Sequence, residues 1–169
     1  LRGEEGQVDF FFFFFGHDGG IQFRSRSVAP AGHIQPVAGE GPGIGDQHMK
    51  FVADNVRPTL DFNYRTLNDQ GNTFVGGSSR GGLISLYLVH ETNIFGGVLA
   101  MSPSLTRASN YTAALYGKAK PAARIYMDTG TDEQIDGTDY WNKPWEGYDI
   151  FLGHGHIVNR DLLMRIGCG

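Results

Sequence analysis

A serine set among closely spaced glycines stands between an apolar run and a leucine-rich segment of this chain. Residues 77–82 read Gly-Ser-Ser-Arg-Gly-Gly; the run 73–75 precedes them, and Leu and Ile recur through residues 80–90. This order predicts a strand, a tight turn and a helix. Because Gly77 and Gly81 lack Cβ atoms, the strand and the helix can approach closely and hold Ser79 in a strained, exposed conformation.

An exposed serine on such a turn is the geometry of a catalytic nucleophile. The backbone N–H of Arg80 would lie at the helix N-terminus, where unpaired donors and the helix dipole favour an oxyanion. The alternative is a plain Gly/Ser turn between strand and helix, and Ser78 is expected to point away from the site. The flanking elements favour the catalytic interpretation for Ser79 and make Arg80 half of an oxyanion hole.

The rest of the chain alternates apolar runs with segments of helical spacing, apart from a Gly/Pro/Ser-rich loop over residues 24–45. Alternation of this kind predicts an α/β fold, a parallel sheet with helices on both faces, whose active groups follow the carboxyl ends of strands. We expect strands at 10–15, 73–75, 97–101, 124–128 and 148–152, and helices at 46–58, 80–90, 109–116 and 158–166.

Composition excludes several classes of partner and site. The length of 169 residues suits one domain, and 14 basic against 18 acidic residues give a charge of -4, without the basic footprint of a nucleic-acid binder. No apolar run approaches the roughly 18 residues of a membrane span. The single cysteine, Cys168, leaves no intrachain disulfide and no cysteine metal cluster. We therefore expect neither nucleic acid nor membrane as a partner, and no metal.

Several segments together resemble the putative-esterase family of α/β-hydrolases, which includes esterase D, enterochelin esterases, feruloyl esterases and mycolyltransferases. The resemblance rests on residues 74–86, 100–104, 125–133 and 153–156, and on the His-Asp-Gly sequence at 17–19. It implies a three-layer α/β-hydrolase fold with a mostly parallel sheet. Family members carry two further N-terminal strands, so it also implies a reduced single domain over residues 1–169, incomplete at the N-terminus.

The resemblance also implies which carboxylate serves as the acid of a Ser-His-acid triad. The family places this group three residues after a glycine that follows a strand, which selects Glu133 after Gly130. Asp132 is the close alternative, and Asp128 and Asp136 are more distant ones. Whichever acts must accept a hydrogen bond from the histidine and stabilise its protonated ring.

For the base, the family pattern Gly-x-Gly-His selects His156 over its neighbour His154. On the expected order of elements, His156 follows the last strand and reaches Ser79 across the strand ends. The resemblance assigns the second oxyanion donor to the backbone N–H of Gly20. A metal-dependent hydrolase using His154 and His156 with His17 and Asp18 is a formal alternative, although no further metal pattern accompanies them.

These residues predict a serine carboxylic-ester hydrolase acting through an acyl-enzyme, without a cofactor. Its substrate would be a small-molecule or carbohydrate-linked ester. Two alternatives stay open: an acyltransferase using the same acyl-enzyme, and a catalytically silent or incomplete esterase-like binding domain. The sequence does not choose the acyl and alcohol parts of the substrate, the compartment or the oligomeric state.

Overall fold

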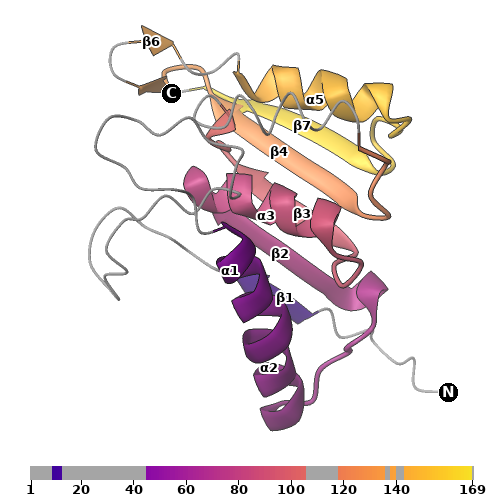
Figure 1. Cartoon of the computed structure of the whole chain (residues 1–169). Helices are drawn as coiled ribbons and strands as arrows, with labels where there is room; N and C mark the ends of the chain where they lie inside the picture. The colour runs from indigo at the N-terminus through magenta and orange to yellow at the C-terminus, as the bar shows by residue number, and fades with distance from the viewer. Residues whose placement is uncertain (1–8, 13–44, 106–117, 136–137, 140–142, 169) are drawn as a thin grey trace, which may run out of the picture.

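The protein is built on one parallel β-sheet. The computed structural model describes residues 9–12, 45–105, 118–135, 138–139 and 143–168. Five strands pair in the order β1-β2-β3-β4-β7, and all four pairings are parallel (Figure 1). Their bounds are β1 Asp9–Phe12, β2 Thr73–Ser78, β3 Gly97–Met101, β4 Arg124–Gly130 and β7 Leu162–Gly167. The carboxyl ends of β2, β3 and β4 therefore share one edge, as the sequence predicted.

Helices connect the strands. A nearly continuous helical segment comprises α1 (Gly45–Phe51), a π-helical stretch (Val52–Val56) and α2 (Arg57–Asn63). Next come a short 3₁₀ turn (Gln70–Asn72), α3 (Arg80–Glu91) between β2 and β3, and α5 (Lys143–Gly153) before β7. A small antiparallel pair, β5 (Gln134–Ile135) and β6 (Thr138–Asp139), lies outside the main sheet.

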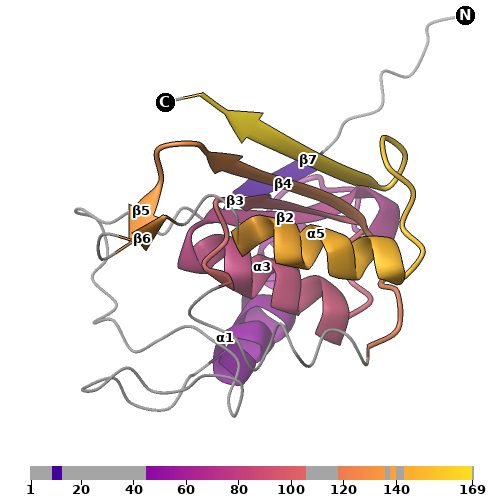
Figure 2. The ribbon, with the colours of Figure 1, turned by 90° about the horizontal axis from the view of Figure 1, so that it is seen from above.

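The helices α1, α3 and α5 lie on the same face of the sheet (Figure 2). The strand order explains this placement: β2, β3, β4 and β7 follow one another across the sheet in chain order. Right-handed crossovers that all step in one direction put their helices on one face. Of the two helical layers expected from the sequence, the described part of the chain thus supplies one.

The core lies between this helical layer and the sheet. Along β4, Ile125, Met127 and Thr129 are buried, whereas the alternate residues are more exposed, so one face of the strand is turned toward the helices. On α5, Ile150 and Phe151 are almost fully buried. Complete burial of an aliphatic or aromatic side chain stabilises the fold by about 1.5–3 kcal/mol.

Two expected elements at the C-terminal end are wrong. Residues 148–152 were expected as a strand and 158–166 as a helix, but the first segment lies in α5 and most of the second forms β7. The apolar residues of 148–152 fit a buried strand as well as a helix, and the buried positions Gly147, Ile150 and Phe151 follow helical spacing. This exchange moves the loop between them to the other end of the sheet.

Smaller differences concern element boundaries. The helix expected to close at Pro58 continues to Asn63: Pro58 stands in the first turn of α2, directly after the π-helical stretch Val52–Val56. The strand over 10–15 is observed as Asp9–Phe12, and the expected helix at 109–116 lies outside the described residues. In the described ranges, no helix is long and apolar enough to cross a membrane.

Candidate active site

The turn after β2 has the strained geometry expected of a nucleophile elbow. Ser79 has φ 57° and ψ -118°, a backbone conformation that residues other than glycine rarely adopt, and α3 begins at the next residue. A Cβ at Gly77 would lie 2.7–2.9 Å from backbone atoms of Gly81. The two glycines thus allow the close contact that the turn requires.

Backbone hydrogen bonds fix this turn from both sides. The N–H of Ser79 donates to the carbonyl of Met101 at 2.8 Å, and the Ser79 carbonyl accepts from Leu83 at 3.1 Å and from Ser104 at 3.0 Å. The hydroxyls of Ser79 and Ser104 lie 2.9 Å apart. Ser79 is exposed, whereas Ser104 is buried. The nucleophile candidate is therefore held rigidly with its side chain near solvent.

The expected oxyanion donors divide between described and undescribed residues. Arg80 is the first residue of α3, so its backbone N–H belongs to the first turn, where helix N–H groups have no acceptor within the helix. This is the position that the sequence assigned to one donor. Gly20, the other expected donor, lies outside the described residues, as do His17 and Asp18.

Glu133 lies at the same sheet edge, on the turn after β4. Its carboxylate accepts hydrogen bonds from the hydroxyl of Ser102 and from the N–H of Gly130 at 2.9 Å, with the Thr129 hydroxyl at 3.5 Å. The alternative acid, Asp132, is exposed and accepts from the Thr131 hydroxyl at 3.3 Å. Of the two neighbours, Glu133 is the one fixed at the strand ends.

The other two carboxylates differ in their surroundings. Asp128 accepts from the N–H of Ser102 at 3.0 Å and from the hydroxyl of Tyr126 at 3.0 Å, so it is engaged within the sheet edge. Burial and this bond to Asp128 raise the pKa of Tyr126. Asp136 lies outside the described residues.

His156 lies at the amino ends of the strands, on the opposite side of the sheet from the carboxyl ends that hold Ser79 and Glu133. It precedes β7, and the first residue of β7, Leu162, pairs with Ile125 near the start of β4. Ser78, beside Ser79, is level with Asp128, three residues further along β4. Three residues of strand span about 10 Å. The contact expected between His156 and Ser79 is therefore not formed.

The physical reason is the exchange of helix and strand described above. The sequence interpretation placed His154 and His156 after a strand, at its carboxyl end, whereas they follow α5 and lead into the amino end of β7. His90 lies at the same amino edge: it stands in the last turn of α3, and its ring centroid is 6.5 Å from that of His154. The structure brings Ser79, Arg80 and Glu133 to the carboxyl ends of the strands, whereas these three histidines lie at the amino ends.

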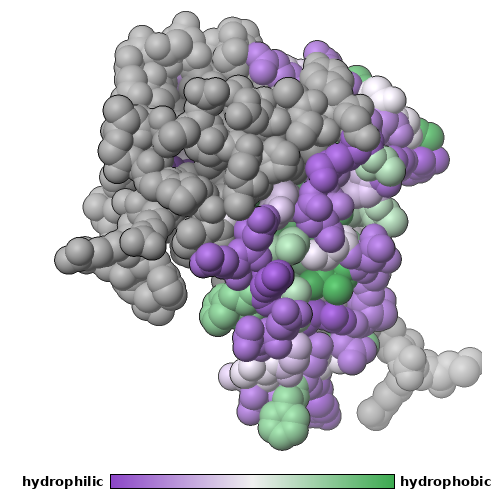
Figure 3. Space-filling view, in the orientation of Figure 1, coloured by the Kyte–Doolittle hydropathy of each residue, from purple (hydrophilic) through white to green (hydrophobic). Residues whose placement is uncertain are grey.

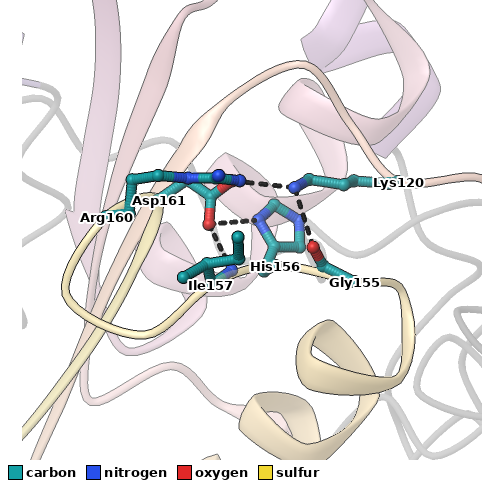
Figure 4. Close-up of polar contacts among 6 residues, drawn as sticks. All are labelled: Lys120, Gly155, His156, Ile157, Arg160 and Asp161. Atoms are coloured by element: carbon teal, nitrogen blue, oxygen red, sulfur yellow. Dashed lines mark hydrogen bonds and ion pairs between the residues drawn. The ribbon is translucent and has the colours of Figure 1, made fainter.

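The surroundings of His156 are those of a structural residue (Figure 4). Its ring is buried, and Nδ1 lies 3.9 Å from a carboxylate oxygen of Asp161. The other oxygen of Asp161 accepts from Lys120 at 2.7 Å and from Arg160 at 3.0 Å, and Lys120 also donates to the carbonyl of Gly155 at 3.0 Å. Burial, reinforced by Lys120, lowers the pKa of His156.

The hydrogen bond from Lys120 is the main cause that lowers the pKa of Asp161.

In the space-filling view, hydrophilic residues dominate the visible coloured surface (Figure 3). Among the residues that the structure describes, no three His, Cys, Asp or Glu side chains are placed to bind a metal ion. The paired histidines therefore form no recognised ligand set there.

Two residues of this edge were given no role by the sequence interpretation, Ser102 and Ser104. Both follow the buried strand β3, which neighbours the strand of the elbow. Polar residues just after the carboxyl end of a buried parallel strand are the signal that could have identified them. Their contacts link Ser79 to the turn of Glu133.

Comparison with known proteins supplies a family and a fold. A family model described as "Putative esterase" matches residues 15–149. Similar solved structures include the enterobactin esterase FES from Shigella flexneri, with 19% identity and a TM-score of 0.62 over 73% of this chain and 33% of that one. The siderophore hydrolase EstA from Aspergillus nidulans has 19% identity and a TM-score of 0.59 over 86% of this chain and 59% of the other.

A ferulic acid esterase from Anaeromyces mucronatus has 19% identity and a TM-score of 0.57 over 73% of this chain and 46% of the other. No curated protein sequence matches. The chain spans about a third of the length of the enterobactin esterase. At these identities the structural likeness establishes a reduced α/β-hydrolase fold.

Proposed function

The chain belongs to the "Putative esterase" family, and from this premise we propose that it is a serine carboxylic-ester hydrolase with Ser79 as its nucleophile. The observation that carries the proposal is the elbow: φ 57° at Ser79, between β2 and α3, with Gly77 and Gly81 in contact. A strained, exposed serine at the start of a helix is what an acyl-transfer nucleophile requires. Neither a metal nor a cofactor enters the proposed reaction.

In the proposed reaction, Ser79 Oγ attacks the ester carbonyl carbon and passes its proton to a histidine base. The N–H of Arg80, with that of Gly20 as the second donor, stabilises the negatively charged carbonyl oxygen. The intermediate collapses to an acyl-enzyme, and the alcohol leaves with the proton from the base. Water then attacks the acyl carbon and gives a proton to the base, and the base returns that proton to Ser79 Oγ as the acid is released. Glu133 holds the base through a hydrogen bond.

The expected base is the member of the triad that the structure does not bring to Ser79. His156 was the expected base, but its loop lies at the amino ends of the strands. Of the six histidines in the sequence, His17 and His33 lie outside the described residues. Both therefore belong in the experiment, together with His48 on α1 and with His156.

The position of His156 favours a second candidate function, a catalytically silent esterase-like binding domain. Such a domain would keep the elbow and the acid turn without a base beside Ser79. The two candidates differ in one measurable property, the nucleophilicity of Ser79, because a serine hydroxyl at its ordinary pKa is a weak nucleophile without a base.

Labelling with a fluorophosphonate probe tests this choice. We expect covalent modification of the wild-type chain on the peptide that carries Ser79, none in Ser79→Ala, and unchanged labelling in the matched control Ser78→Ala, as read by mass spectrometry. Absence of labelling in the folded wild type would favour the silent binding domain. Labelling of Ser79→Ala at the wild-type rate would assign the nucleophile elsewhere.

The same probe tests the base. We expect His156→Gln to label at the wild-type rate, because His156 lies more than about 10 Å from Ser79 along the strands. One of His17→Ala, His33→Ala and His48→Ala should slow labelling by about a hundredfold or more, the usual contribution of a general base. A hundredfold loss in His156→Gln, with its thermal unfolding midpoint unchanged, would contradict the arrangement in the structure.

A further inference from the structure

The end of β3 and the residues that follow it, 101–104, lie between the elbow and the acid turn and contact both. On the elbow side, Met101 and Ser104 make backbone hydrogen bonds with Ser79 at 2.8 Å and 3.0 Å, and the Ser104 hydroxyl lies 2.9 Å from that of Ser79. We name residues 101–104 the β3 turn. It is the physical connection between the proposed nucleophile and the proposed acid.

On the acid side, Ser102 makes the contacts. Its N–H donates to the carbonyl and to the carboxylate of Asp128, at 3.1 Å and 3.0 Å. Its hydroxyl donates to Oε1 of Glu133, which also accepts from the N–H of Gly130 at 2.9 Å. Two donors therefore engage Oε1, whereas Oε2 has the Thr129 hydroxyl at 3.5 Å, the limit of a hydrogen bond. Oε2 retains the greater capacity to accept from another group.

The backbone of Ser102 is itself strained, with φ 41°. A positive φ favours glycine, and a serine there costs free energy that the surrounding contacts must offset. Glycine at this position would keep the N–H bonds to Asp128 and lose the hydroxyl alone. The one polar group that serine adds over an unstrained glycine is the hydroxyl that binds Glu133.

We propose that Ser102 is a positioning residue, whose hydroxyl fixes the Glu133 carboxylate so that Oε2 can accept from the histidine that serves Ser79. This inference rests on the proposed function and adds to it a residue that touches neither substrate nor nucleophile. A glutamate has several rotatable bonds, and the Ser102 and Gly130 donors restrict them before the reaction begins. Preorganisation of this kind raises the rate without contributing to substrate binding.

The test replaces Ser102 by glycine and by alanine and measures hydrolysis of a p-nitrophenyl ester by the full chain. Glycine removes the hydroxyl and relieves the positive φ, whereas alanine removes the hydroxyl and keeps the strain. We expect both variants to lose about tenfold or more in kcat with KM unchanged, as for other groups that orient a reacting side chain. The unfolding midpoint of Ser102→Gly should equal or exceed that of Ser102→Ala.

A double-mutant cycle with Glu133→Gln separates positioning from a structural effect. The kcat loss of Ser102→Gly should vanish in the Glu133→Gln background, because the hydroxyl acts through the carboxylate. Equal kcat losses of Ser102→Gly in both backgrounds would overturn the inference, and so would a wild-type kcat in both Ser102 variants. In either case, turnover that depends on Ser79 would still support the proposed function. A folded wild type without Ser79-dependent turnover would overturn the proposed function, and this inference with it.

Discussion

Replacing Ser79 with alanine is expected to lower the rate of ester hydrolysis by at least about a thousandfold, which is the usual result of removing a covalent nucleophile. The backbone of the elbow depends on the close contact of Gly77 with Gly81 and on the bonds of Ser79 to Met101 and Ser104, which the substitution leaves in place. Alanine and serine carry the same Cβ, so the positive φ costs both residues a similar amount. Steady-state hydrolysis of p-nitrophenyl esters measures the effect.

The variant should stay folded, because within the described residues the hydroxyl of Ser79 contributes one hydrogen bond, with that of Ser104. A single neutral hydrogen bond stabilises a fold by about 1 kcal/mol. The unfolding midpoint should therefore fall by a few degrees at most, and Ser78→Ala serves as the matched control that keeps activity. A Ser79→Ala sample with the wild-type rate, purified free of other esterases, would refute the nucleophile assignment.

Acidification is expected to destabilise the protein between pH 6.5 and about pH 4, through histidine rings at the amino edge of the sheet. Three rings surround Phe151: those of His90, His154 and His156 have centroids 5.6, 6.3 and 5.8 Å from that of Phe151. We name these three residues the histidine cluster. The ring nitrogens of His154 and His156 are buried without a hydrogen-bond partner in the described structure. For His156, burial makes protonation of the ring unfavourable.

The direction of the pKa changes gives the sign of this effect. Burial lowers the pKa of His90 to about 4 and also lowers that of His156. The unfolded chain, with histidine pKa near 6.5, binds these protons first as the pH falls. Their contribution to stability is therefore complete above pH 6.5 and is lost as the pH falls toward the folded-state values.

Charged neighbours of the histidine cluster modify these pKa values without reversing the direction. Lys118 further lowers the pKa of His90 and Lys120 that of His156, while Glu91 and Asp161 act in the opposite direction. His48, on α1, is partly buried with a lowered pKa and adds to the same trend. The hydrogen-bonded carboxylate of Asp161 loses its own contribution only as the pH falls below about 4, so the two effects occupy different pH windows.

Urea unfolding at pH 7.5, 6.5, 5.5 and 4.5 measures the prediction. We expect the free energy of unfolding to change little between pH 7.5 and 6.5 and to fall by more than about 2 kcal/mol by pH 4.5, since a tenfold change in proton affinity corresponds to about 1.4 kcal/mol. His90→Phe should reduce this fall, because it keeps a ring beside Phe151 and removes a titrating group. A free energy that stays constant from pH 7.5 to 4.5 would contradict the burial of uncharged rings.

The class of fold could be predicted from the sequence because its signals are local. The strands around Val75, Val98 and Ile125 and the helix after Ser79 have unambiguous apolar patterns, and their alternation requires a parallel sheet. The C-terminal part could not be predicted in this way. The apolar residues of 148–152 fit the period of a strand as well as that of a helix. The helix is decided by the burial of Ile150 and Phe151 and by the contacts of α5 with β4 and β7, which are tertiary properties.

The turn around Ser79 could be predicted from the sequence, since two glycines flanking Ser79 between a strand and a helix permit few other conformations. It likewise placed Glu133 at the same edge, because a turn that follows a parallel strand ends up beside the turns that follow its neighbours. The position of His156 at the other end of the strands and the hydrogen bond from Ser102 to Glu133 depend on tertiary packing. Which end of a sheet a loop occupies depends on the direction of the elements before and after it, and contacts between residues 31 positions apart depend on how the strands pair.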